Sequence, residues 1–206
     1  MMRVKVCGIT SPEDALVAVE AGADALGFIF VEGTPRFVAP ERAAAIIREL
    51  PPFVTPVGVF WDHPAGHVKA VAEACGLRAL QFHGDEAPED VTRHALPAIK
   101  TIKVSGPVDG ARLARYRVAA FLLDSAERWS EGEARRPIEW ALAREIGRRH
   151  RVILSAGLTP DNVAEAIAAA RPYAVDVNSG VEAAPGRKDP DRVRRFVAAA
   201  KGTAWP

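Results

Sequence analysis

The chain has 206 residues, 49% of them hydrophobic and 26% charged, and its 27 basic and 26 acidic residues leave a net charge of +1. That size fits one domain that buries most of its apolar surface. The charge balance excludes a strongly basic nucleic-acid-binding protein and a protein drawn to anionic membranes. The two cysteines, Cys7 and Cys75, are too few for a disulfide scaffold.

The first residues lead directly into an apolar, strand-like run and lack the features of a signal peptide. No apolar run approaches the roughly 18 residues that a membrane span needs. We therefore expect a cytoplasmic protein that binds neither nucleic acid nor membranes. The sequence does not distinguish a monomer from a homodimer, and a homodimer stays open.

Short apolar runs alternate with longer amphipathic segments along the chain. Runs rich in Val, Ile, Leu and Phe predict strands buried on both faces. They are Val4–Cys7, Ala25–Phe30, Pro56–Phe60, Ala79–Phe82, Ile99–Val104, Ala119–Leu123, Val152–Leu154 and Ala174–Val177. Between them apolar residues recur at helical spacing, most clearly over residues 193–200.

Helix starts and stops support this division. Ser11, Thr159 and Asp189 each precede a proline and an acidic residue, an arrangement that caps a helix. Gly22 and Gly76 stand where helices should end. Eight strand–helix units predict an α/β fold with a parallel sheet. The pattern fits a single-domain (β/α)8 TIM barrel over residues 1–206 or an open doubly wound sheet.

Polar residues at the strand ends favour the barrel. Its strands all end at one mouth, where active sites of this fold lie. Six polar side chains stand at or just after predicted strand ends, namely Cys7, Arg36, Gln81, His83, Asp124 and Asp176. A barrel mouth brings them together economically.

The loops after the seventh and eighth strands are suited to phosphate. Gly157 and Gly180 can expose backbone N–H groups, and a short helix beginning at Ser179 would direct its positive end at an anion. Each glycine alone is more simply a turn residue. Two such loops in these positions favour a phosphate site.

Several segments together resemble the phosphoribosylanthranilate isomerase family, within the ribulose-phosphate-binding barrel superfamily. They cover the chain in order: 5–10, 35–36, 81–84, 122–125, 157–163, 176–182 and 185–189. The resemblance implies a (β/α)8 barrel of tryptophan biosynthesis that rearranges N-(5′-phosphoribosyl)anthranilate to a 1-deoxyribulose 5-phosphate bearing the arylamine. This Amadori rearrangement moves protons only, so we expect no metal and no cofactor.

The resemblance assigns Asp124 as general acid and Cys7 as general base. A free carboxyl titrates near pH 3.9, so Asp124 should need a pKa raised by partial burial. A free thiol titrates near 8.5, so Cys7 would work better with a pKa lowered by a nearby positive charge. Lys5 lies two residues away on the same strand face and could supply it, or could instead pair with Asp176.

The remaining groups are assigned to substrate binding. By resemblance, Arg36 holds the anthranilate carboxylate, and Asp176 orients the substrate near the amine. The phosphate would be held by Gly157, Asn178, Ser179 and Gly180. Gln81 and His83 lie at the mouth without an assigned step.

Three positions depart from the family pattern. The loop over 129–136, with Trp129, Arg135 and Arg136, has one glycine where the family has a run of them. Ala156 replaces a common glycine, and a positive φ there would be costly. Asn178 replaces the usual serine but can still donate a hydrogen bond.

Other interpretations explain less of the sequence. Related barrels that convert phosphosugars are indole-glycerol-phosphate synthase, thiamine-phosphate synthase, ribulose-phosphate 3-epimerase and the histidine-pathway isomerase. A non-catalytic phosphosugar-binding barrel would not need both Cys7 and Asp124. His63 and His67 have metal-ligand spacing but no evident third ligand. Cys75 and Trp140 are expected to be packing residues.

Overall fold

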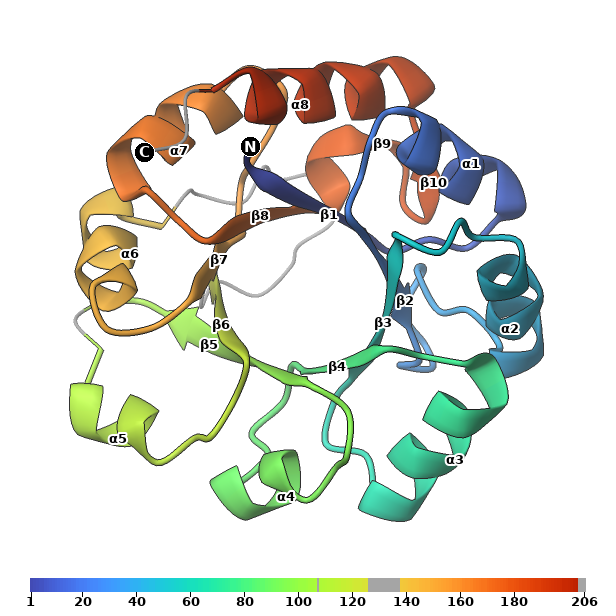
Figure 1. The fold of residues 1–206 in the computed structure, drawn as a ribbon, viewed down its shortest axis with the longest axis horizontal. Helices are drawn as coiled ribbons and strands as arrows, with labels where there is room; N and C mark the ends of the chain where they lie inside the picture. Colours follow the sequence, from blue (N-terminus) through green and yellow to red (C-terminus); the bar gives the residue numbers. More distant parts are fainter. Residues whose placement is uncertain (107, 126–137, 204–206) are drawn as a thin grey trace.

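The chain folds as a closed barrel of eight parallel strands surrounded by helices (Figure 1). The computed structural model describes residues 1–106, 108–125 and 138–203. The strands are β1 (Arg3–Cys7), β2 (Ala25–Ile29), β3 (Thr55–Phe60), β4 (Ala79–Phe82), β5 (Ala98–Val104), β6 (Ala120–Ser125), β7 (Val152–Leu154) and β8 (Ala174–Val177). Each strand pairs with its sequence neighbours, and β8 pairs with β1. The closed order confirms the barrel and excludes the open sheet.

The helices form the outer ring. They are α1 (Pro12–Glu20), α2 (Pro40–Arg48), α3 (Ala65–Cys75), α4 (Pro88–Thr92), α5 (Gly110–Ala114), α6 (Trp140–Gly147), α7 (Val163–Ala170) and α8 (Pro190–Gly202). A 3₁₀ turn, η1 (Ser179–Val181), and a small hairpin of β9 (Glu182–Ala184) and β10 (Arg187–Lys188) stand between β8 and α8. The hairpin was not predicted. No helix of the described residues is long and apolar enough to cross a membrane.

Two of the three predicted helix caps are confirmed. Ser11 accepts a hydrogen bond from the backbone of α1, and Asp189 accepts two from α8. The start predicted after Thr159 was wrong, because α7 begins at Val163. The side chain of Asn162 instead accepts from the Thr159 N–H and donates to the Gly157 carbonyl. The residues before α7 are therefore used to fold the loop that follows β7.

The barrel interior is divided into an apolar half and a polar half. A cluster of apolar side chains fills it near the amino ends of the strands: Val57, Ala79, Ile99, Ala120, Leu122, Ile153 and Ala174. Above them, towards the carboxyl ends, the buried side chains are polar, including Lys5, Thr101 and Asp124. A larger apolar core packs between strands and helices. The apolar cluster closes the barrel near the amino ends of the strands, so the polar residues line a cavity that opens at the carboxyl ends.

A buried ion pair fixes two of the loops at this mouth. Lys100 on β5 donates to the Gly84 carbonyl at 2.6 Å and to Glu86 Oε2 at 2.7 Å. Glu86 Oε1 also accepts from the Asp62 N–H at 2.9 Å. Burial raises the pKa of Glu86, but the hydrogen bond from Lys100 and those from the backbone outweigh burial and leave it below its ordinary value. The pair therefore joins the loops after β3 and β4.

Replacing Lys100 by Met should destabilise the protein by about 3–5 kcal/mol, because it leaves the Glu86 carboxylate buried without its cation. The deficit should shrink as the pH falls towards and below the ordinary pKa of a glutamate, near 4.3. There the lowered pKa of Glu86 no longer favours the folded wild type, and the variant can protonate its carboxyl. Urea unfolding across pH measures both effects.

The control is Lys69→Met, which removes an exposed i,i+4 pair with Glu73 on α3. It should change the unfolding free energy by less than about 0.5 kcal/mol. Equal losses in the two variants would contradict a special role for the buried pair.

Candidate active site

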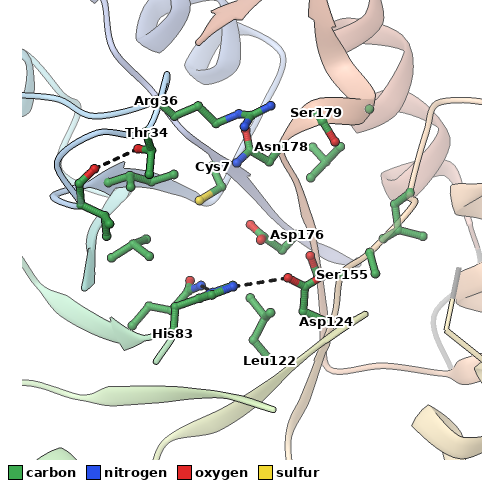
Figure 2. A pocket seen from close by; sticks show the side chains of 18 of the residues that line it. Cys7, Thr34, Arg36, His83, Leu122, Asp124, Ser155, Asp176, Asn178 and Ser179 are labelled. Carbon is green, nitrogen blue, oxygen red and sulfur yellow. Dashed lines mark hydrogen bonds and ion pairs between the residues drawn. The ribbon is translucent and has the colours of Figure 1, made fainter. Parts of the chain in front are cut away.

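The mouth of the barrel holds a cavity of about 220 Å³. All ten residues predicted from the sequence line it: Cys7, Arg36, Gln81, His83, Asp124, Gly157, Asp176, Asn178, Ser179 and Gly180. Figure 2 shows the Cys7 thiol directed into this space, with the side chains of Asp124 and His83 across from it. The structure thus brings the predicted groups together, while their individual roles stay predictions.

Cys7 stands beside the ion pair that links the first and last strands. Lys5 Nζ lies 2.8 Å from Asp176 Oδ1, and both side chains are buried. This is the pairing that the sequence left open for Lys5. Burial raises the pKa of the Cys7 thiol, and the charge and hydrogen bond of Lys5 do not outweigh burial. The lowered pKa that would favour Cys7 as a base is therefore not seen: a desolvated thiol sits next to a cation that Asp176 already neutralises.

Burial also lowers the pKa of Lys5, but the charge of Asp176 and the hydrogen bond to it outweigh burial and raise the pKa above its ordinary value. Lys5 is therefore held as a cation. A thiolate formed at Cys7 would lie beside this fixed positive charge.

Asp124 is held from two sides. It lies at the carboxyl end of β6, where it was predicted, one residue before the last of the strand, and its carboxyl is buried. Oδ1 accepts from the Ser125 N–H at 2.9 Å, and Oδ2 lies 3.4 Å from His83 Nε2. His83 follows β4 and Asp124 lies on β6, so residues from two strands position the carboxyl (Figure 2).

Arg36 is oriented by Glu182, a residue to which no role was assigned from the sequence. Glu182 accepts from Arg36 Nε at 2.9 Å and from Nη2 at 2.6 Å, a two-point contact on one edge of the guanidinium. Burial raises the pKa of Glu182, but the bonds from Arg36 and the charge of Lys188 outweigh burial and keep the carboxylate ionised. Arg36 enters the cavity from the loop after β2.

Lys188 extends this contact to the phosphate loop. Its buried Nζ donates to Glu182 Oε1 at 3.1 Å and to Asn178 Oδ1 at 2.9 Å. Burial lowers the pKa of Lys188, although the charge of Glu182 opposes this. Both residues belong to the β9–β10 hairpin and to motifs of the family resemblance, and that membership was the only signal for them in the sequence.

The two loops proposed for phosphate meet at the cavity. Ala156 and Gly157 both have φ of +65°, so the alanine adopts the costly conformation expected for it. Gly180 packs so closely that a Cβ there would collide with the Leu158 carbonyl oxygen. The predicted short helix after β8 is the single turn η1 at Ser179. Close packing against the Leu158 backbone, more than freedom of φ, therefore explains why position 180 is a glycine.

The other predictions have mixed outcomes. The loop 129–136, with Trp129, Arg135 and Arg136, lies outside the described residues. Trp140 and Cys75 pack into or against the core as expected. The rings of His63 and His67 stack at 4.9 Å, and no three His, Cys, Asp or Glu side chains among the described residues are placed to hold a metal ion.

A closed (β/α)8 barrel with a thiol, a carboxyl, a guanidinium and two close-packed backbone loops around one cavity defines the class of sugar-phosphate-converting barrel enzymes. The family model for N-(5′-phosphoribosyl)anthranilate (PRA) isomerase matches residues 4–199. The chain therefore belongs to the N-(5′-phosphoribosyl)anthranilate isomerase family, an enzyme family of tryptophan biosynthesis. This decides against the other barrel enzymes and the non-catalytic barrel considered above.

Known relatives agree over the whole chain. An N-(5′-phosphoribosyl)anthranilate isomerase of a Geobacter species is 51% identical over 201 residues, which cover 98% of each chain. The phosphoribosyl anthranilate isomerase of Thermotoga maritima superposes with a TM-score of 0.91 at 44% identity, over 98% of this chain and all of that one. A further isomerase structure, with a TM-score of 0.88, 44% identity and the same coverage, is a complex with reduced 1-(o-carboxyphenylamino)-1-deoxyribulose 5-phosphate.

The raised pKa of Cys7 predicts how its reactivity depends on pH. Because alkylating reagents attack the thiolate, the rate of Cys7 modification by iodoacetamide should still be climbing at about pH 10, where an ordinary thiol with a pKa near 8.5 has reached its plateau. Mass spectrometry of the Cys7 peptide gives the rate at each pH.

Lys5→Met should shift the same profile to still higher pH, because the Lys5 charge is the largest effect opposing burial. Cys75→Ala should leave it unchanged, since Cys75 is buried in α3 away from the cavity. A wild-type midpoint at or below that of an ordinary thiol, near pH 8.5, would contradict the raised pKa.

Proposed function

We propose that Asp124 and Cys7 are the general acid and base of the isomerisation of N-(5′-phosphoribosyl)anthranilate. Asp124 gives its proton to the ring oxygen as the bond from that oxygen to C1′ breaks, which opens the ring to an iminium. Cys7, as thiolate, takes the proton from C2′, and the resulting enolamine rearranges to the aminoketone. The observation that carries the proposal is the placement of the two groups in one cavity, on β1 and on β6.

The binding groups follow from the same geometry. Glu182 engages the Nε edge of Arg36, and the proposed partner of the guanidinium on the cavity side is the anthranilate carboxylate. Asp176 would orient the substrate near the amine. The phosphate would lie against the close-packed backbone loops, at Gly157, Asn178, Ser179 and Gly180. Gln81 and His83 would contact or support the reacting part of the substrate.

The reaction needs no redox partner or metal, because only protons move. We also place it in the cytoplasm, where two free thiols, Cys7 and Cys75, would stay reduced.

Asp124→Asn should lower kcat by about 10²–10⁴-fold, because the amide cannot supply the proton that opens the ring. With phosphoribosylanthranilate generated in situ, the loss of its fluorescence measures turnover. Cys7→Ser should have an effect of similar size, because a hydroxyl is a far weaker base at neutral pH.

The matched control is Asp161→Asn, the same change at an exposed carboxylate paired with Arg195 outside the cavity. Its turnover should equal that of the wild type. Undiminished turnover in Asp124→Asn would remove Asp124 from the acid role but keep the reaction. No turnover by folded wild type would contradict the function itself.

We further propose that the protein forms a homodimer through the face opposite the mouth. Phe53, in the turn between α2 and β3, is 94% exposed at the amino ends of the strands. Phe is among the residue types that folded proteins most often bury, so this exposed side chain is available for contact with a second copy of the chain. A related isomerase from Thermotoga maritima is described as dimeric. A dimer through this face would leave both active-site mouths open.

Light scattering after gel filtration should then give twice the chain mass of 22.1 kDa for the wild type. Phe53→Ser should give the monomer mass, because it removes the apolar contact. Leu16→Ser, which changes an exposed apolar residue on α1, should leave the dimer intact. A monomeric wild type, or a dimeric Phe53→Ser protein, would contradict the proposed face.

A further inference from the structure

Gln81, Thr101 and His83 form a hydrogen-bonded chain, and its last member, His83, makes an ion-pair contact with Asp124. Gln81 on β4 and Thr101 on β5 are both buried. Gln81 Nε2 lies 3.4 Å from Thr101 Oγ1 and 3.4 Å from His83 Nδ1, and Thr101 Oγ1 lies 3.1 Å from the same Nδ1. The other ring nitrogen, Nε2, faces Asp124 Oδ2. The hydrogen bond that each member makes therefore limits which atom of the next member can carry the hydrogen.

The direction of the chain is set at its inner end. An amide nitrogen can only donate hydrogen bonds, so Thr101 Oγ1 and His83 Nδ1 both accept from Gln81, and the Thr101 hydroxyl can donate its own hydrogen to Nδ1. His83 Nδ1 then faces two donors, the hydroxyl of Thr101 and the amide of Gln81, and must act as acceptor. In a neutral imidazole with an accepting Nδ1, the proton is on Nε2. That N–H is directed at Asp124.

The orientation of the Gln81 amide supports this direction. Its Oε1 is buried and has no hydrogen-bond partner among the described residues. Exchanging the two amide atoms would reverse the chain, but it would put an NH₂ group, with two donors, in the same unpartnered place. A buried unpaired donor is rarer than a buried carbonyl oxygen with an unused acceptor. The orientation in the structure is therefore the less costly one.

We infer that Gln81 and Thr101 fix His83 in its Nε2–H tautomer, and that Thr101 is a positioning residue for Asp124. The catalytic part of this inference rests on the proposed role of Asp124 as the general acid. The Ser125 N–H at Oδ1 and the His83 ring at Oδ2 thus help to orient the carboxyl that, on the proposed acid role, gives its proton to the substrate. After transfer, both donors remain in place to stabilise the carboxylate.

The tautomer can be observed without turnover. Two-bond ¹H–¹⁵N correlation spectra of histidine-labelled protein distinguish a protonated from an unprotonated ring nitrogen, and His83→Gln assigns the signal among the five histidines. We expect the Nε2–H pattern for wild-type His83. An Nδ1–H pattern would overturn the inference, whether or not any Thr101 variant folds.

Thr101→Val removes the hydroxyl but keeps the shape, and Thr101→Ser keeps the hydroxyl. Thr101→Val should give a mixture of both tautomers at His83 and lower kcat about tenfold, as expected for one lost hydrogen bond. Thr101→Ser should keep the Nε2–H tautomer and stay within about threefold of wild-type kcat. A Thr101→Val protein with an unchanged tautomer and unchanged kcat would overturn the role of Thr101.

The spectra and the turnover assay separate this inference from the proposed function. An Nε2–H tautomer that depends on Thr101, together with full turnover in Asp124→Asn, would keep the hydrogen-bonded chain and overturn its link to the acid step. Loss of turnover in Asp124→Asn, together with an Nδ1–H tautomer, would keep the acid and overturn the chain.

Discussion

The ion pair between Lys5 and Asp176 joins the first strand to the last, and the arrangement of the site depends on it. The two residues are direct partners in the β1–β8 register, and their charged atoms lie 2.8 Å apart in the interior. A shift of this register by one residue would turn one of the two side chains towards the helices. Two unpaired charges would then be buried, which is a severe penalty. The closure of the barrel and the position of Cys7 are therefore specified together.

The same device recurs twice around the cavity. Lys100 pairs with Glu86 at 2.7 Å, and Lys188 pairs with Glu182 at 3.1 Å. The first pair links β5 to the loop after β4, and the second links the two strands of the β9–β10 hairpin. Buried ion pairs contribute little net stability compared with apolar packing. Their effect here is to select one arrangement of the loops, above an apolar cluster that already holds the barrel closed.

Much of this architecture could be predicted from the sequence, because the signals for strands and their ends lie in neighbouring residues. Runs such as Val152–Leu154 are apolar, short and bounded by polar residues, so both ends of that strand were predicted correctly. The polar residues at strand ends reached the cavity because parallel strands carry them there. The start of α7 was missed because Asn162 turns its side chain back to the loop, a contact that competes with helix capping and leaves no periodic signal.

The residues that orient the site were harder to find, for a physical reason. Glu182 meets Arg36 across 146 positions of sequence, and Thr101 meets His83 across 18. Whether such side chains touch depends on strand register and on the hairpin after η1, which no local pattern encodes. The direction of the Cys7 pKa shift could not be derived from the sequence for a related reason. A neighbouring lysine is visible in sequence, but the extent of burial that outweighs it is not.

The β9–β10 hairpin has a consequence for substrate selection. Through Glu182 and Lys188 it holds both Arg36 and Asn178, which lie at the places proposed for the two anionic ends of the substrate. The two proposed anchor points are thus linked through one hairpin, and these contacts set the span between them. On the proposed assignments, the site would select a dianion whose carboxylate and phosphate are separated by that span over shorter or longer dianions, even when their reacting carbons are identical.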